Sequence, residues 1–365
     1  MGERIAAARG RAGLTQAELA AEVSLDRSAL TKIENGSRRV SALELARIAD
    51  ALGERIEWFV TEPPKAIVSH RNVQEPGGKS PAIDRLIERV AWNVEFVIEH
   101  SDRLDQPQLG GLSRPGTLDE AERAADRARS LLGLDEVQPF PGIADQLVEA
   151  GLLVFSFDLG PDAADAASIL LAAGGVAAVN GNLHVGRRRL AAIHEFGHYL
   201  FADEYVVDWR VADSDDANAW ETRLDRFARA VLLPAHGLRQ SWEALVSGGD
   251  DLRTVVVKIG SKFRVDMSTL ARRLVELRIV PQDQAQRIRA VRTNRADIVE
   301  HNLVVGAELV APGLPTPYER AVLRLYRQEL VSAARAADLL FDTWEEDDLP
   351  ALSQLPESAI WEFVS

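Results

Sequence analysis

The chain has 365 residues, of which 46% are hydrophobic and 27% are charged, a balance typical of folded globular proteins. A domain takes about 100–200 residues, so we expect two or three domains. Lys and Arg number 42 against 56 Asp and Glu, and the formal charge of −14 argues against a histone-like or coat-like nucleic-acid binder, which would be basic throughout.

Cysteine is absent from the sequence. This excludes disulfides, thiol catalysis and cysteine-ligated metals, so any metal site has to use histidine and carboxylate ligands. The first residues, MGERIAAARGRAG, lack the apolar core of a secretion signal, and no apolar run approaches the ~18 residues of a membrane span. We therefore expect a soluble, cytoplasmic protein with no membrane partner.

Residues 1–62 have the pattern of short amphipathic helices joined by tight turns. Three residues are placed to cap the following helices: Thr15, Asp26 and Ser41. Glu18 stands three residues after Thr15, which is the spacing of a capping box. Gly36 is suited to end the helix that Asp26 begins, because glycine readily adopts the left-handed conformation. This segment is therefore predicted to be an all-α domain.

The same segment resembles a known DNA-binding family. Residues 13–53, with Gln16, Ala20 and the ending Ile33-Glu34-Asn35-Gly36, are similar to the XRE, or Cro/repressor-like, helix-turn-helix family. The resemblance implies that the helix after Asp26 enters the major groove of an operator in double-stranded DNA. Its expected base-reading residues are Arg27, Ser28, Thr31 and Lys32. The expected phosphate contacts are Gln16, Asn35, Arg38 and Arg39.

The charge of this first domain is unusually low for a DNA reader. Residues 1–62 hold nine Lys and Arg against ten Asp and Glu, a net charge of −1. Because phosphate contacts supply much of DNA affinity, we expect either weak binding or binding as a homodimer on palindromic DNA. The alternative is a helix-turn-helix used for protein contacts only.

Breaker-rich stretches divide the middle of the chain. Pro and Gly cluster at 62–64, 74–81 and 106–116, and apolar residues at helical spacing between them predict an amphipathic helix over 83–100. We therefore expect a linker with one helix at 63–117, a domain at 118–280 and a helical C-terminal extension at 281–365. We assign no chemistry to that extension.

The start of the second domain changes from helical to strand patterning. Helices are predicted at about 118–132 and 141–150, followed by a buried strand at 151–157. Two further short strands, 175–180 and 183–185, flank Asn180-Gly181-Asn182, whose Asn-Gly pair is typical of a tight hairpin. From residue 187 onward helical patterns dominate.

The clearest chemical motif is His194-Glu195-Phe196-Gly197-His198, an HExxH sequence in an apolar helical context. Residues i and i+4 share one face of a helix, so both imidazoles can bind a single ion while Glu195 polarises a bound water. A catalytic zinc needs a third protein ligand. On a helix through 221–234, Glu221 can supply that ligand, and Asp225 on the same face can accept a hydrogen bond from a ligand histidine.

These residues resemble a metallopeptidase family. The run Arg187–Phe201 looks like the core of the ImmA/IrrE metallopeptidases, and Glu221–Pro234 is similar to the family's ExxANxFAxxLLxP element, with Leu224 in place of Ala and Asp225 in place of Asn. Residues 257–280 are similar to the helical segment that follows. The resemblance covers about 120–280.

The resemblance implies an α+β, mostly helical protein with a gluzincin-like domain, in which a small β-sheet packs on the HExxH helix. It implies Zn²⁺ held by His194, His198 and Glu221, with Glu195 as general base. A further donor has to stabilise the oxyanion of the transition state. The sequence leaves several suppliers open: Tyr199, Tyr205, His184, His236 and Arg223.

Together the two resemblances predict a DNA-binding transcriptional regulator with a zinc-dependent endopeptidase domain. Such proteins are expected to cleave a regulatory protein, such as a repressor, in a bacterial stress or mobile-element response. The alternative is a non-proteolytic, antitoxin-like repressor whose peptidase-fold domain binds a partner toxin or senses a ligand. In either case the partner, repressor or toxin, can be encoded next door.

Overall fold

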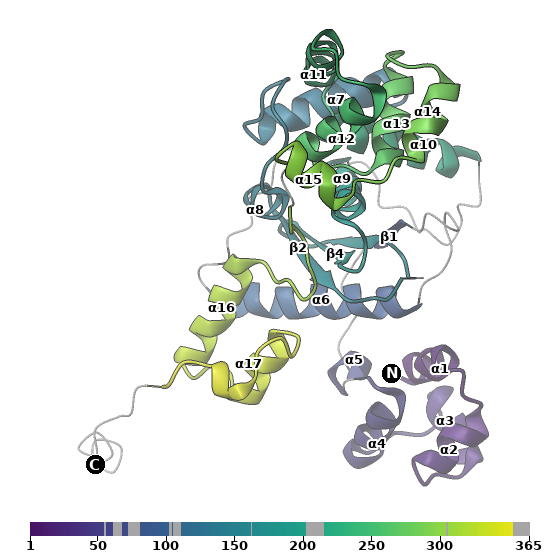
Figure 1. Ribbon diagram of the computed structural model, residues 1–365. Coiled ribbons are helices and arrows are strands. Elements are labelled where there is room, and N and C mark those ends of the chain that lie inside the picture. The colour runs from purple at the N-terminus through teal and green to yellow at the C-terminus, as the bar shows by residue number, and fades with distance from the viewer. Residues whose placement is uncertain are drawn as a thin grey trace. The chain divides into compact units, whose positions relative to one another are not determined.

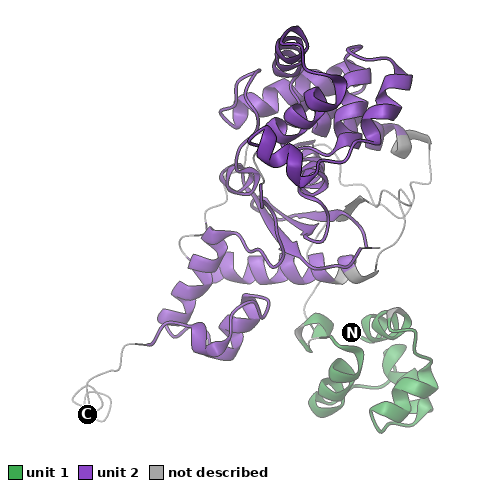
Figure 2. Cartoon of the chain, viewed as in Figure 1, with its two compact units in different colours: residues 1–65 green, residues 66–365 purple. Residues whose placement is uncertain are grey.

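The computed structural model describes residues 1–54, 56–60, 68–71, 81–101, 104, 111–161, 163–201, 215–303 and 306–352. The chain separates into two compact units, Met1–Lys65 and Ala66–Ser365 (Figure 2). The breaker stretch 62–64 and most of 74–81 lie outside the described residues.

Unit 1 is all-α, as its sequence pattern predicts. Its helices are α1 (Gly2–Arg11), α2 (Gln16–Glu22), α3 (Arg27–Glu34), α4 (Ala42–Leu52) and α5 (Ile56–Val60). The capping box of Thr15 and Glu18 is confirmed, and Ser41 forms a second one with Glu44. Asp26 precedes α3 as predicted, but its side chain makes no capping hydrogen bond. Gly36 is left-handed, with φ of 76°.

A small apolar core joins α1 to α4. Leu19, Leu30 and Ile48 are fully buried in it. Gly2 lies where α1 meets the end of α3, and an added Cβ there would stand 2.3 Å from the carbonyl oxygen of Ile33. The first helix is therefore fixed against α3 by close backbone contact as well as by side-chain packing.

Unit 2 is built on a four-stranded sheet. Its strands are β1 (Val68–Arg71), β2 (Leu152–Phe157), β3 (Ala166–Leu170) and β4 (Gly175–Asn180). They lie in the order β1-β3-β4-β2, with β2 parallel to β4 and β3 antiparallel to both β1 and β4.

Helices make up the rest of unit 2. They are α6 (Pro81–His100), α7 (Leu118–Leu131), α8 (Ile143–Glu149), α9 (Val185–Phe201), α10 (Asp215–Leu232), α11 (Ala235–Ser247), α12 (Leu252–Phe263), α13 (Met267–Glu276), α14 (Gln282–Arg289), α15 (Arg295–Glu300), α16 (Thr316–Arg327), α17 (Ala333–Leu339) and the 3₁₀ turn Glu346–Asp348. The α+β, mostly helical class is confirmed, and so are the helices predicted at 83–100, 118–132 and 141–150.

The sheet separates two apolar cores. Alternate side chains of a strand point to opposite faces, so Leu152 and Val154 contact the core that contains α7, α9 and α10. Leu153 and Phe155 belong to the second core, which α6, α16 and α17 cover. Figure 1 shows α6 running along the face of the sheet opposite α9. Burial on both faces explains why β2 and β4 are almost entirely apolar.

The predicted hairpin around Asn180-Gly181-Asn182 is wrong. The strand 175–180 exists as β4, but the chain then turns directly into α9, and the hairpin partner of β4 is the unpredicted β3. Tertiary contacts hold this turn. The Asn180 side chain donates to the carbonyl of Gly160 at 2.8 Å, and a Cβ on Gly181 would stand 2.3 Å from that of Ala311.

Candidate metal centre and DNA interface

The HExxH residues lie on α9, which is buried along most of its length. His194 and Glu195 are 1% and 0% exposed, because α9 packs between the sheet and α10. Gly197 makes this close packing possible. A Cβ at that position would stand 2.9 Å from Cδ2 of Leu224 and 3.1 Å from Cδ1 of Phe227, both on α10.

The close approach of α10 brings a carboxylate to both imidazoles. Nε2 of His194 lies 3.1 Å from Oε2 of Glu221, and Nε2 of His198 lies 3.7 Å from Oε1 of the same side chain. The possible ligand atoms of these three residues all lie within 4.8 Å of one another. The three predicted ligands therefore converge in the folded chain.

This donor set fits a zinc ion. Zinc bonds of about 2.0–2.2 Å in tetrahedral geometry place ligand atoms roughly 3.3–3.6 Å apart, and the two measured separations bracket that range. Burial raises the pKa of Glu221, but the hydrogen bond from His194 and the charge of His198 outweigh it, so the pKa lies below its ordinary value. Glu221 is therefore an anionic ligand at neutral pH.

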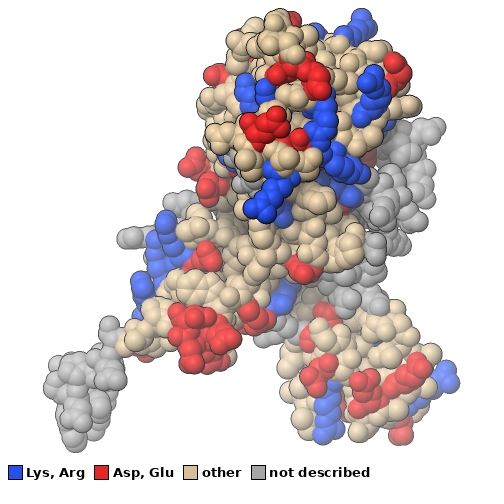
Figure 3. Space-filling model, viewed as in Figure 1, with Lys and Arg blue, Asp and Glu red and all other residues tan. Residues whose placement is uncertain are grey.

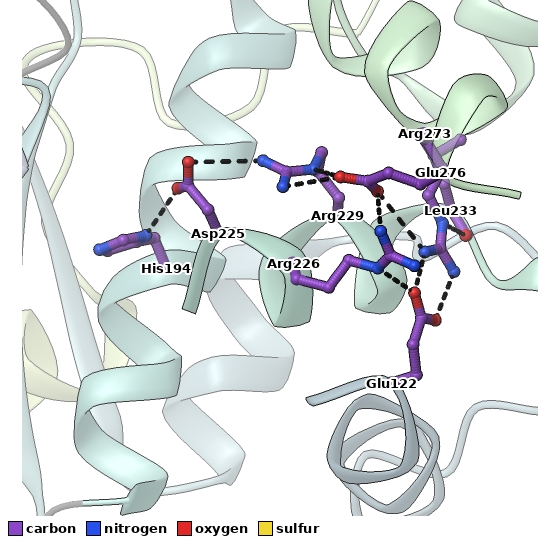
Figure 4. Close-up of polar contacts among 8 residues, drawn as sticks. All are labelled: Glu122, His194, Asp225, Arg226, Arg229, Leu233, Arg273 and Glu276. Carbon is purple, nitrogen blue, oxygen red and sulfur yellow. Dashed lines mark hydrogen bonds and ion pairs between the residues drawn. The ribbon is translucent and has the colours of Figure 1, made fainter. Parts of the chain in front are cut away.

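A chain of polar contacts runs from His194 away from this cluster (Figure 4). Nδ1 of His194 lies 3.2 Å from Oδ1 of Asp225. A proton on Nδ1 that is donated to Asp225 leaves the lone pair of Nε2 for a metal. Oδ2 of Asp225 in turn pairs with Arg229 at 3.4 Å, and Arg229 pairs with Glu276 at 2.8 Å. The orientation of His194 therefore depends on charges outside the cluster.

Glu195 has a partner that the sequence did not indicate. Oγ of Ser168 donates a hydrogen bond to Oε2 of Glu195 at 2.5 Å, and both side chains are buried. Ser168 lies on β3, the strand that the sequence pattern missed. Because the contact links a strand to a helix that follows much later, no local spacing could have predicted it.

The suggested oxyanion donors are scattered. His184 and His236 are exposed residues near the starts of α9 and α11. At 1.5 Å rise per residue, His184 lies about 15 Å from His194 along α9. Nη1 of Arg223 donates to the carbonyl of Gly116 at 3.2 Å, and Tyr199 packs against the apolar core. Tyr205 lies outside the described residues. The length of α9 therefore removes His184 from the vicinity of the cluster.

In unit 1 the expected base-reading residues divide into two groups. Arg27, Ser28 and Lys32 are exposed on α3. The hydroxyl of Thr31 instead donates to Oε1 of Gln16 at 3.1 Å, and Nε2 of Gln16 donates to the buried Glu34 at 2.6 Å.

The expected phosphate contacts also differ from one another. Arg39 is exposed, whereas Arg38 pairs with Glu44 at 2.7 Å. Asn35 is exposed and its side-chain oxygen accepts from the backbone N–H of Ser37. Figure 3 shows acidic and basic side chains intermixed on the visible face of residues 1–65, in keeping with the near-neutral charge of this segment.

Two family models match the chain. Residues 5–59 match a helix-turn-helix family, and residues 149–275 match the IrrE N-terminal-like domain. The chain is a fusion of an XRE-type helix-turn-helix domain with an ImmA/IrrE-type peptidase domain. The matched part of the ImmA/IrrE-type domain contains β2 to β4, the whole of α9 and α10, and hence the His194, His198 and Glu221 cluster.

Comparisons with curated proteins and with solved structures do not extend this assignment. No curated protein matches the chain. One solved structure, the crystal structure of ComR from S. thermophilus in complex with DNA and its signalling peptide ComS, aligns over 93% of this chain and 97% of its own at 10% identity. Its TM-score of 0.18 is too low to support an argument about the fold. None of the helices in the described residues is long and apolar enough to cross a membrane.

Together, these two domain families indicate a DNA-binding regulator with a metallopeptidase-type domain. The ImmA/IrrE match ends at residue 275, yet α16 and α17 pack with α6 on the sheet face opposite α9. The C-terminal helices therefore complete the core beneath the peptidase fold.

Proposed function

We propose that this protein is a transcriptional regulator whose ImmA/IrrE-type domain is an active zinc endopeptidase that cleaves a regulatory protein. In this proposal residues 1–62 bind an operator and residues 118–280 carry the hydrolytic chemistry. The observation that supports it best is the convergence of His194, His198 and Glu221 beside the buried Glu195.

In the proposed reaction each residue has one role. His194, His198 and Glu221 would hold Zn²⁺, which supplies Lewis acidity and an activated water when it is bound. Glu195 accepts a proton as general base and later delivers it to the leaving amine. Ser168 holds the Glu195 carboxylate in place through its hydrogen bond. Asp225 fixes the ring of His194.

Zinc loading is the first test. Full-length protein purified without chelator is expected to contain one zinc per chain, measured by elemental analysis, and Glu221→Ala is expected to lose it. Asp225→Ala keeps all three ligands and removes only the support of His194. It is therefore expected to bind zinc about 10–100-fold more weakly in a competition titration.

Two results would contradict the ligand assignment. One is a wild-type protein that contains no zinc and takes up none when zinc is added. The other is a Glu221→Ala variant that retains stoichiometric zinc with wild-type affinity. Circular dichroism of each variant shows whether the fold is intact, and Glu243→Ala, a change at an exposed site on α11, is the matched control.

DNA binding is tested on the exposed face of α3. The double variant Arg27→Ala/Lys32→Ala is expected to bind a duplex from upstream of its own gene roughly 10–100-fold more weakly than wild type, because base and phosphate contacts are both lost. The plot of log affinity against log salt is also expected to become shallower. Fluorescence anisotropy of the labelled duplex measures both quantities.

The control for this experiment is Arg47→Ala, which removes an exposed arginine of α4 in the same unit. Wild-type affinity in the α3 double variant would refute the assignment of α3 as the recognition helix. That result would favour the alternative hypothesis, in which the helix-turn-helix domain makes protein contacts only.

A further inference from the structure

A cavity lies outside the proposed metal cluster, among α7, α10, α13 and α14. Its volume is about 320 Å³, within the range of sites for small ligands. Four arginines line it: Arg226, Arg229, Arg272 and Arg289. Glu276 and two apolar side chains, Leu118 and Val275, complete much of the wall. The cavity therefore offers both positive charge and a small apolar surface.

Two of these arginines belong to a balanced network. Figure 4 shows Arg226, Arg229 and Arg273 facing three carboxylates, those of Glu122, Glu276 and Asp225. Arg229 is 5% exposed and pairs with both Glu276 and Asp225. Arg226 pairs with Glu122 and, at 3.5 Å, with Glu276. Three positive and three negative charges cancel, so this network leaves no excess charge in the cavity.

The other two arginines are not balanced. Within the described part of the chain, no hydrogen bond or ion pair is formed by the guanidinium groups of Arg272 or Arg289. They add two positive charges to a wall that is otherwise neutral. Other basic residues nearby in the sequence are paired: Arg253 with Asp297, Lys258 with Asp250 and Arg264 with Glu308. Figure 3 shows both basic and acidic side chains on the visible face of unit 2.

We propose that this cavity binds a small organic molecule that carries a phosphate monoester. Near neutral pH a phosphate monoester carries between one and a half and two negative charges, about the number that Arg272 and Arg289 leave uncompensated. Planar guanidinium groups match phosphate oxygens through paired hydrogen bonds. Leu118 and Val275 are suited to contact the organic part. The limited volume favours a small molecule over a DNA duplex, which would have to bind outside the cavity.

The position of Arg229 links this cavity to the metal cluster. Arg229 lines the cavity and also pairs with Asp225, which contacts Nδ1 of His194. A phosphate that draws Arg229 toward itself weakens its pairing with Asp225 and so changes the support of His194. The bound phosphate therefore changes zinc affinity, and zinc changes phosphate affinity by the same factor. This coupling rests on the proposed metal site, whereas phosphate binding itself does not.

Direct binding is measured on metal-free, full-length protein by isothermal titration calorimetry. The probes are glycerol 2-phosphate and inorganic phosphate, with glycerol as the uncharged comparison. We expect both phosphates to bind and glycerol not to bind. Arg272→Ala/Arg289→Ala removes only guanidinium groups without protein partners, so the fold should be kept. We expect it to weaken phosphate binding by about tenfold or more, because charge-assisted hydrogen bonds are lost.

The matched control is Arg287→Ala/Arg295→Ala, which removes two exposed arginines of α14 and α15 that do not line the cavity. It is expected to leave phosphate affinity within about twofold of wild type. The proposal is overturned if neither phosphate binds, or if both double variants weaken binding equally. It is also overturned if the arginines of the cavity prove to bind a DNA duplex and no small phosphate.

The coupling is measured by zinc competition titrations with and without glycerol 2-phosphate. We expect a several-fold change of zinc affinity in wild type and none in Arg272→Ala/Arg289→Ala. A complex of zinc with the phosphate in solution would affect both proteins equally, so this variant also controls for it. An unchanged zinc affinity in wild type overturns the coupling. If the protein binds no zinc at all, the proposed function fails, while the direct titration still decides whether the cavity binds phosphate.

Discussion

Replacing Glu195 by Gln is expected to lower proteolysis by about 10²–10⁴-fold while zinc remains bound. The amide cannot accept the proton that a general base has to take, whereas His194, His198 and Glu221 are untouched. Gln is nearly the same size as Glu, and its side-chain oxygen can still accept the hydrogen bond from Ser168. The expected loss is therefore one of chemistry and not of folding or metal binding.

The measurement compares zinc-loaded wild type and Glu195→Gln in a lysate from cells that lack the protein. Mass spectrometry detects new protein termini, and elemental analysis confirms equal zinc content. Glu243→Gln, the same substitution at an exposed position of α11, is expected to behave as wild type. If wild type and Glu195→Gln produce the same termini, or none, and both still repress transcription, the non-proteolytic regulator is the better account.

Replacing Arg273 by Ala is expected to destabilise unit 2 by about 3–5 kcal/mol, because it breaks a buried ion pair from one side. Arg273 is fully buried. Its Nε donates to the carbonyl of Leu233 at 2.9 Å, and its Nη2 donates to Glu122 at 2.8 Å. The substitution leaves that carbonyl without a donor and opens a cavity between α7, α10 and α13. Urea unfolding, followed by circular dichroism, measures the change.

The neighbouring residue gives the control. Arg272→Ala removes an exposed arginine of the same helix and is expected to change stability by less than about 0.5 kcal/mol. Equal unfolding midpoints for the Arg273→Ala and wild-type proteins would show that this network does not contribute to stability.

The pH dependence of stability offers a second check on Arg273. Burial raises the pKa of Glu122, but its hydrogen bonds and charge interactions with Arg273 and Arg226 outweigh burial, so the pKa lies below its ordinary value near 4.5. The stability that Glu122 contributes is present above that ordinary value and is lost as the pH falls through the lowered pKa. In Arg273→Ala this acid-induced loss should be smaller.

Local patterns predicted much of the fold and of the site. The caps at Thr15 and Ser41 act within four residues, and HExxH needs only the geometry of one helix. The hairpin predicted at Asn180-Gly181-Asn182 from its Asn-Gly pair is wrong, because contacts with Gly160 and Ala311 hold this turn instead. The local sequence sets the conformation of a turn only where no distant segment of the chain makes contacts that favour another conformation.

The missed residues share one property, which is that their partners are far away in the chain. Ser168 reaches Glu195 because β3 lies beside α9, and Glu122 reaches Arg273 across 151 positions. No spacing rule connects such pairs. They exist because the sheet and the helices bury a common apolar core and so bring their polar side chains together.

The sequence by itself determined the chemistry available to this protein. Without cysteine a metal site had to use histidine and carboxylates, and the spacing of His194 and His198 placed two of them on one helix face. Only the tertiary structure decided what supports them. The close packing of α10 at Gly197 brings Glu221 and Asp225 to the imidazoles, and the packing of α13 against α10 and α14 creates the arginine-lined cavity. Both depend on how helices pack, which is set by the shape of whole surfaces and not by neighbours in sequence.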